Sequence, residues 1–390
     1  MTIGSKRVAA LAQRETPFYY YDMDLLRRTL DALQTALGDS GYHVHYALKA
    51  NANLPILREM IGRGLGADCV SGNEVWRALE AGFPPERIVF AGVGKSDREI
   101  GIGLDAGIFC FNVESVQELE VIEALAAERR ITAGVALRIN PDLDAKTHHY
   151  ITTGRDENKF GIPAGDMDAA LAFLEGSERL TLRGLHVHIG SQITDLGVFE
   201  ALCERINTIQ RGLLEAHPGL DLPHLNLGGG LGIDYGDPDG RPVVDFARYF
   251  GIIRSHLRPL EGQQVHFELG RAIVAQCGYL ISRVLFTKAG ASKRFAILDA
   301  GMTELIRPAL YQATHRIENL SAADDADRGE WDVVGPVCES ADFFAKGVRL
   351  PEMRRGDLVA VRSAGAYGEV MASHYNLREL QPAVYSDELH

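Results

Sequence analysis

The sequence has no excess of positive charge, no long hydrophobic run and few cysteines, and each absence excludes a class of protein. Its 390 residues include 40 lysines and arginines against 53 aspartates and glutamates, a formal net charge of −13. Binding to nucleic-acid phosphates needs a basic surface, so we expect no nucleic-acid partner. The first twenty residues lack the apolar stretch of a signal peptide, and no run approaches the roughly 20 apolar residues of a membrane span. We therefore expect no membrane partner.

The cysteines argue against both disulfides and metal. There are five of them, far apart and without a CxxC pair: Cys69, Cys110, Cys203, Cys277 and Cys338. A disulfide framework and a zinc site both use closer, paired spacings, so we predict neither, and no metal. With 46% hydrophobic and 24% charged residues, the composition is that of a globular protein. We expect a cytoplasmic location.

Short apolar runs alternate with amphipathic stretches over the first two thirds of the chain. Eight runs predict strands, at Tyr42–Leu48, Ala67–Val70, Arg87–Ala91, Ile108–Asn112, Ala133–Ile139, Arg183–Ile189, His224–Leu227 and Gln264–Leu269. Helical patterns cover Met23–Leu37, Leu54–Arg63, Gly72–Ala81, Ser96–Ala106, Ser115–Arg130, Asp166–Glu175, Val198–His217 and Asp245–Leu260. Ser115 followed by Glu118 predicts a capping box. The unbroken alternation predicts an α/β fold with a (β/α)₈ TIM-type barrel, in preference to an open doubly wound sheet.

The pattern changes after Arg271. Strand-like segments at Tyr279–Thr287, Arg294–Asp299, Trp331–Val334 and Asp357–Val361 are separated by turns, with no long helical pattern between them. The segment Thr16–Tyr21 is also strand-like. We predict a barrel at residues 23–270 and a mostly-β domain formed by residues 1–22 and 271–390.

Candidate chemical groups follow the predicted barrel strands, at the end where such barrels carry their active sites. A run of three glycines, Gly228, Gly229 and Gly230, follows the seventh strand. Successive glycines let backbone N–H groups approach an anion, and the loops after strands seven and eight are a frequent phosphate site. Ser191 and Arg271 add donors. A tight turn alone is the alternative, but the position favours phosphate.

Lys49 follows the first strand and Glu268 lies in the last. A desolvated lysine can form a Schiff base with an aldehyde, whereas a surface lysine that covers apolar area is the simpler reading of Lys49 alone. A phosphate site at the same rim favours the Schiff-base role of Lys49 over the surface role. Pyridoxal phosphate is a cofactor that carries both an aldehyde and a phosphate. A carboxylate at Glu268 is then placed to keep the pyridine nitrogen protonated, or it is a structural partner of Arg271. His188 either stacks on the ring or is a hydrogen-bonded core residue.

These segments resemble those of the diaminopimelate decarboxylases, in the alanine-racemase-like, barrel-type group of pyridoxal phosphate enzymes. The resemblance runs nearly end to end. The motifs are YALKAN (Tyr46–Asn51), GADCVSGNE (Gly66–Glu74), HVHIGSQ (His186–Gln192), LNLGGGLG (Leu225–Gly232), ELGR (Glu268–Arg271), DAGMTELIRPALY (Asp299–Tyr311), GPVCES (Gly335–Ser340) and SAGAYG (Ser363–Gly368). The family pattern usually has proline where this chain has Leu269, and we expect no change of function from that.

The resemblance implies a role for each of these residues. Lys49 would hold the cofactor covalently, with Asp68 close by and His188 on one face of the ring. Phosphate would be bound by Ser191, Gly228, Gly229, Gly230, Gly270 and Arg271. The substrate's far end would contact Arg271, Arg307, Tyr311 and Glu339, and Tyr367 would contact both cofactor and substrate. Cys338 would deliver a proton, and the partner subunit would supply Cys338 and Glu339 in a homodimer with shared active sites.

The activity that the resemblance implies is decarboxylation of meso-2,6-diaminopimelate to L-lysine and CO₂, the last step of lysine biosynthesis. Related barrel-type decarboxylases act on D-lysine, D-ornithine, arginine or carboxynorspermidine. The arginines expected at the far carboxylate argue against the simple diamino monoacids, which would leave those arginines unpaired. The alanine racemases fit the CES and GAY motifs less well. A non-catalytic, cofactor-binding homologue would be expected to have lost Lys49 or Cys338, and both are present.

Overall fold

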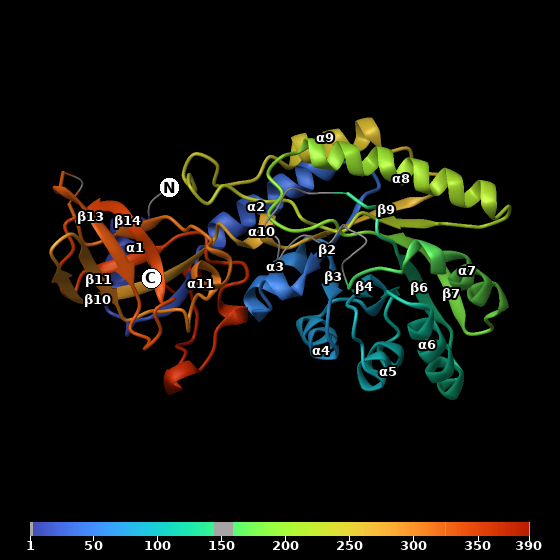
Figure 1. The fold of residues 1–390 in the computed structure, drawn as a ribbon, viewed down its shortest axis with the longest axis horizontal. Helices are drawn as coiled ribbons and strands as arrows, with labels where there is room; N and C mark the ends of the chain where they lie inside the picture. The colour runs from blue at the N-terminus through green and yellow to red at the C-terminus, as the bar shows by residue number, and fades with distance from the viewer. Residues whose placement is uncertain (1–2, 144–158, 324, 390) are drawn as a thin grey trace. The chain divides into compact units, whose positions relative to one another are not determined.

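The computed structural model describes residues 3–143, 159–323 and 325–389 and divides the chain into two compact units (Figure 1). The first unit contains Leu30–Gly232 and Asp245–Gly270. The second contains Met1–Thr29, Ile233–Val244 and Arg271–His390, so a short internal segment of the chain groups with both ends of the sequence.

The first unit is built on a closed barrel of eight parallel strands. In order they are β2 (His43–Ala47), β3 (Gly66–Cys69), β4 (Ile88–Phe90), β5 (Cys110–Val113), β6 (Ala133–Arg138), β7 (Leu180–His186), β8 (His224–Asn226) and β9 (Gln264–Leu269). The last strand closes the barrel against the first, with Tyr46 opposite Leu269. An open doubly wound sheet has two free edges. The predicted closed barrel is therefore confirmed.

Helices follow the barrel strands, as the alternating pattern predicts. They are α3 (Leu54–Gly62), α4 (Gly72–Ala81), α5 (Asp97–Ala106), α6 (Val116–Arg129), α7 (Met167–Gly176), α8 (Gly197–Ala216) and α9 (Phe246–His256), and the predicted helix α2 (Met23–Leu37) precedes the first barrel strand. The prediction of a capping box at α6 was half wrong. Ser115 accepts from the Glu118 amide, but the Glu118 carboxylate accepts from the Glu114 amide and pairs with the buried ammonium of Lys95 at 2.6 Å. A buried cation attracts this carboxylate more strongly than the cap amide does.

The second unit is mostly β. Its sheet follows the path β12–β15–β10–β11–β13–β14, and β1 joins it by pairing with β10 and β16. The strands are β1 (Phe18–Tyr21), β10 (Gly278–Ala289), β11 (Arg294–Leu298), β12 (Ile317–Asn319), β13 (Arg328–Val334), β14 (Phe343–Pro351), β15 (Leu358–Val361) and β16 (Val384–Tyr385). Three short helices complete it: α1 (Ser5–Leu11), α10 (Arg271–Val274) and α11 (Arg307–Tyr311). One core cluster joins β1 to β10 and β15 through Tyr20, Tyr279 and Ala360.

Among the described residues, the helices are too short or too polar for any of them to cross a lipid bilayer.

Candidate active site

Lys49 and Asp68 meet at the carboxyl end of the barrel. Lys49 lies in a 3₁₀ turn, Leu48–Ala50, directly after β2, and its Nζ is 3.4 Å from Oδ2 of Asp68 in β3. The Asp68 side chain is fully buried, and its Oδ1 has no hydrogen-bond partner among the described residues. Burial, with a contribution from the charge of Glu268, raises the pKa of Asp68 to about 8. The barrel therefore presents an amine beside a carboxyl group that can hold a proton near neutral pH.

Glu268 is a buried carboxylate near the end of β9, held by three donors. Oε1 accepts from Nδ2 of Asn112 at 3.1 Å and from Nδ2 of Asn226 at 2.8 Å, and Oε2 accepts from Nε2 of His186 at 3.1 Å. Burial alone would raise the pKa of Glu268, but His186 and Lys49 lower it well below its ordinary value. Glu268 is therefore a fixed negative charge within electrostatic range of Lys49.

Asn112 and Asn226 are site residues that the motifs of the sequence do not predict. Asn112 is an amide in the otherwise apolar strand β5, and Asn226 is a buried amide at the end of β8. A buried polar side chain in such a strand needs a hydrogen-bond partner inside the barrel, and that requirement was the available signal.

The glycine loop after β8 packs tightly against its neighbours. A side chain on Gly228 would overlap the carbonyl oxygen of Val187, and one on Gly229 would overlap that of Glu268. The Gly228 amide donates to Oδ1 of Asn226 at 2.8 Å, and the Gly229 amide donates to Nδ1 of His188 at 3.2 Å. Of the three amides in this glycine run, only that of Gly230 donates to none of the described residues.

His188 lies directly after β7 and is partly exposed. Because its Nδ1 accepts from the Gly229 amide, a neutral ring carries its hydrogen on Nε2. Burial, with contributions from Lys49 and Arg138, lowers the pKa of His188 well below its ordinary value.

Ser191 follows His188 in the same loop, and a β-bridge between Ile193 and Leu231 joins this loop to the glycine loop. Gly270 directly follows β9 and packs against Ala50. A β-carbon added at residue 270 would lie only 2.9 Å from the β-carbon of Ala50.

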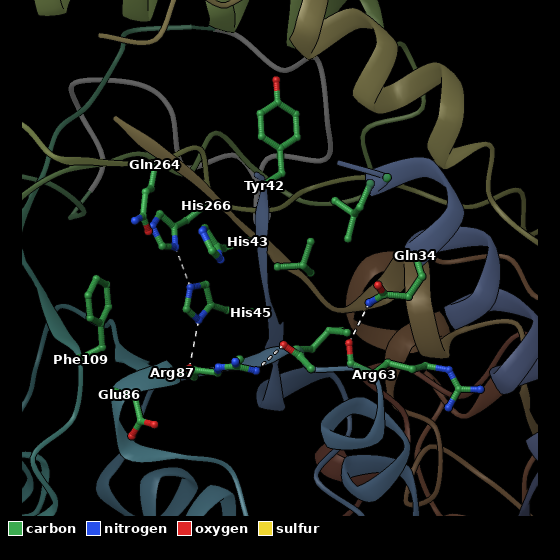
Figure 2. A pocket seen from close by; sticks show the side chains of 16 residues that line it. Gln34, Tyr42, His43, His45, Arg63, Glu86, Arg87, Phe109, Gln264 and His266 are labelled. Atoms are coloured by element: carbon green, nitrogen blue, oxygen red, sulfur yellow. Dashed lines mark hydrogen bonds between the residues drawn. The ribbon is translucent and has the colours of Figure 1, made fainter. Parts of the chain in front are cut away.

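A pocket of about 360 Å³ lies at the opposite end of the barrel, where the strands begin (Figure 2). Three of the side chains that line it are histidines, His43, His45 and His266. His45 contacts His266 on one side and the carbonyl oxygen of Arg87 on the other, at 3.0 and 3.2 Å. Lys49 and Glu268 do not line this pocket, so it is separate from the candidate site.

Two buried arginines form the polar centre of the β-rich unit. NH1 of Arg271 and NH1 of Arg307 both donate to the hydroxyl oxygen of Tyr235, at 2.6 and 2.7 Å. The Arg271 guanidinium also lies 4.7 Å from the ring centre of Tyr367. Burial, with a contribution from Arg271, lowers the pKa of Arg307, and no carboxylate of the described residues forms an ion pair with Arg307. Such a cation is a ready site for an external anion. Tyr311 ends the same helix, α11.

Cys338 and Glu339 lie in the turn between β13 and β14. Cys338 is exposed, and its amide donates to Oδ1 of Asn376 at 3.2 Å. The Glu339 carboxylate accepts from the Ser340 amide at 3.0 Å. In the part of the chain that the structure describes, no hydrogen bond or ion pair joins either side chain to Arg271 or Arg307.

Comparison with known proteins gives the class of this fold and site. Residues 23–275 match the family model described as "Pyridoxal-dependent decarboxylase, pyridoxal binding domain". The chain is 56% identical to a diaminopimelate decarboxylase of Bacteroides thetaiotaomicron, over 96% of each chain. It is 44% identical to the Pseudomonas aeruginosa diaminopimelate decarboxylase, over 93% of this chain and 86% of that one.

A solved structure agrees with these relatives. The crystal structure of Helicobacter pylori diaminopimelate decarboxylase complexed with L-lysine matches at a TM-score of 0.90 and 40% identity. That match covers 97% of this chain and 93% of the other. The chain therefore belongs to the pyridoxal-dependent decarboxylases. Within that family it belongs with the diaminopimelate decarboxylases.

Proposed function

We propose that the chain decarboxylates meso-2,6-diaminopimelate to L-lysine and CO₂ with pyridoxal phosphate, in the cytoplasm. The observation that carries the choice of substrate is the pair of buried arginines, Arg271 and Arg307, joined at one phenol oxygen. A substrate with a second carboxylate supplies an anion for Arg307, which pairs with no carboxylate of the described residues, and a simple diamino monoacid does not. The described cysteines are all unpaired, which fits a reducing compartment.

The barrel residues fit the cofactor. The Lys49 amine would bind its aldehyde, and the orphaned Oδ1 of Asp68 lies beside that amine to exchange a proton. The ionised Glu268 would keep the pyridine nitrogen protonated, and His188 would cover one face of the ring. Ser191, the free amide of Gly230 and the backbone at Gly270 and Arg271 would hold the phosphate. Bound in this way, the cofactor supplies an electron sink for the pair of electrons left when CO₂ departs.

The substrate's far end would be bound by residues of the β-rich unit. Arg271, Arg307 and Tyr311 would hold its carboxylate, Glu339 its amino group, and Tyr367 would contact it as well. Binding energy from this non-reacting end orients the bond that breaks, which must stand perpendicular to the cofactor ring for the electrons to be delocalised. The Cys338 thiol would then return a proton to the same carbon.

The direct test is to incubate the purified protein with pyridoxal phosphate and meso-diaminopimelate and to measure CO₂ and L-lysine. D-Lysine, D-ornithine, arginine and carboxynorspermidine form the comparison panel. We expect turnover of meso-diaminopimelate to exceed that of each diamino monoacid by at least about tenfold. In Lys49→Ala, both activity and borohydride-trapped cofactor should be lost, while the exposed Lys288→Ala should keep both. Equal turnover of the monoacids would reject the assignment.

We propose in addition that two copies share their active sites, each supplying Cys338 and Glu339 to the other. The support is that Cys338 is exposed and that its amide donates to Asn376, which lies in the sequence between two exposed apolar residues, Tyr375 at 49% and Leu377 at 93%. An apolar surface of this kind is typical of an interface between subunits. Mixing inactive Lys49→Ala and Cys338→Ala proteins should restore roughly a quarter of wild-type activity if subunits exchange freely. No recovery after proven subunit exchange would refute a shared site.

A further inference from the structure

Tyr235 joins two arginines that are far apart in the sequence. Its hydroxyl oxygen accepts from NH1 of Arg271 and from NH1 of Arg307. The Arg307 guanidinium also lies 4.7 Å from the centre of the Tyr235 ring. All three side chains are nearly or fully buried. Two buried cations repel each other, so an oxygen that accepts from both fixes how far apart and in which orientation they lie.

His315 fixes the orientation of Arg307 further. The carbonyl oxygen of Arg362 can only accept, so Nδ1 of His315 donates to it, at 2.8 Å. Nε2 of a neutral His315 is then an acceptor, and it receives NH1 of Arg307 at 3.1 Å. The His315 ring also packs edge-on against Tyr235, 5.0 Å between centres. Both hydrogens of Arg307 NH1 are therefore committed to Tyr235 and His315.

The remaining donors of Arg307 make no hydrogen bond to a described residue. Its Nε is buried without a hydrogen-bond partner among them, and NH2 donates to none of them. Nε and NH2 form the side edge of a guanidinium, which binds the two oxygens of one carboxylate. The hydroxyl hydrogen of Tyr235 is likewise left without a described acceptor, since both arginines occupy the lone pairs of its oxygen.

We propose that Tyr235 is the positioning residue for substrate specificity: its hydroxyl aligns Arg271 and Arg307 so that the side edge of Arg307 binds the far carboxylate of the substrate. This role rests on the proposed function and adds to it the residue that sets the preference for a second carboxylate. His315 supports the alignment as an uncharged acceptor. Without the hydroxyl, the two guanidiniums move apart and the carboxylate loses its two-point contact, while the reacting end of the substrate is unaffected.

The variant Tyr235→Phe removes one oxygen and keeps the ring that packs on Arg307 and His315. We expect KM for meso-diaminopimelate to rise about tenfold or more, with a smaller change in kcat. Turnover of D-lysine, which lacks the far carboxylate, should change less than twofold. Tyr20→Phe is the matched control, because the Tyr20 hydroxyl is buried in the same unit and has no hydrogen-bond partner among the described residues. An equal loss for both substrates would show a merely structural role and overturn the proposal.

Binding gives a second readout that needs no turnover. L-Lysine keeps the far carboxylate, and 1,5-diaminopentane is the matched ligand without it. By calorimetry, Tyr235→Phe should weaken L-lysine about tenfold and leave 1,5-diaminopentane unchanged. An unchanged affinity for L-lysine would overturn the positioning role. If the wild type decarboxylates nothing in the panel but Tyr235→Phe still loses L-lysine selectively, the proposed function fails and the positioning role stands.

Discussion

Glu268 shows how neighbours, rather than exposure, set the charge of a single residue. A buried carboxyl group without partners takes up a proton. Here Asn112 and Asn226 donate to one oxygen and His186 to the other, and Lys49 is within electrostatic range. Three hydrogen bonds and a cation outweigh the cost of burial, so the carboxylate stays ionised. This negative charge is what a protonated pyridine ring requires.

The variant Glu268→Gln tests that charge with little change of shape. The glutamine oxygen can still accept from both asparagines, and its amide can donate to His186, whose Nδ1 is buried without a described partner and can take up the hydrogen. We expect normal folding and cofactor retention but a loss of turnover of about 100-fold or more, measured as CO₂ release. Glu261→Gln, in an exposed turn, should be silent. Unchanged kinetics in Glu268→Gln would reject the role.

At the scale of elements, two neighbouring barrel strands approach each other closely at Gly184. This residue of β7 has a φ of 148°, and a β-carbon on it would overlap the carbonyl oxygen of His224 in β8. The pairing between β6 and β7 shifts register next to this position. The strands can keep their places only if residue 184 has no side chain, and the rim residues that follow them depend on those places.

We therefore expect Gly184→Ala to lower the free energy of unfolding by roughly 2–5 kcal/mol, because strain in φ and overlap with backbone add together. Urea unfolding followed by circular dichroism measures it. Gly212→Ala is the matched control, since Gly212 is an exposed position of α8 and nothing lies within 4 Å of the added carbon. That change should raise stability by about 0.5–1 kcal/mol. Equal stability of the two variants would contradict the close approach.

Local pattern predicted the barrel well and the β-rich unit less well. The strand Gln264–Leu269 and the helices Met23–Leu37 and Gly72–Ala81 agree with the structure at both ends, because periodicity and end signals coincide there. The strand β14 was missed, since its residues alternate between exposed and buried only weakly and include Lys346 and Gly347.

The candidate site likewise contains residues that local sequence predicts and contacts that it does not. Motif residues such as Lys49 and Glu268 could be identified because each follows or ends a predicted strand. The contact of Tyr235 with Arg271 and Arg307 spans 36 and 72 residues of sequence. No local signal predicts such a contact, because it depends on how distant segments fold together.

At the scale of the whole molecule, buried histidines make stability depend on pH. In the barrel, His45, His266 and His224 form a chain whose links are both 3.0 Å. His45 ends it by donating to the carbonyl oxygen of Arg87, and Figure 2 shows this end of the chain, from His266 to Arg87. A carbonyl only accepts, so His45 carries a hydrogen on Nδ1. With all three rings neutral, each of the other two links also carries its hydrogen on Nδ1. Burial lowers the pKa of His45 to about 4 and that of His266 to about 2. In the β-rich unit, burial lowers the pKa of His315 to about 3.

The direction of the effect follows from proton binding. Between pH 6.5 and about 4, the unfolded chain protonates these histidines and the folded chain does not, so stability falls as the pH falls through that range. From pH 7.5 to 5.5 each buried histidine contributes a loss of about 1 kcal/mol. Asp68, whose pKa is raised to about 8, acts in the opposite direction, so the comparison must be made between variants.

The variant His266→Gln keeps a donor and an acceptor for His45 and His224 but cannot be protonated. We expect its unfolding free energy in urea to fall less than that of the wild type between pH 7.5 and 5.5, by about 1 kcal/mol. The exposed His374→Gln should follow the wild type at both pH values. If His266→Gln and the wild type lose equal stability over this range, the chain of neutral imidazoles is not what makes the folded protein sensitive to acid.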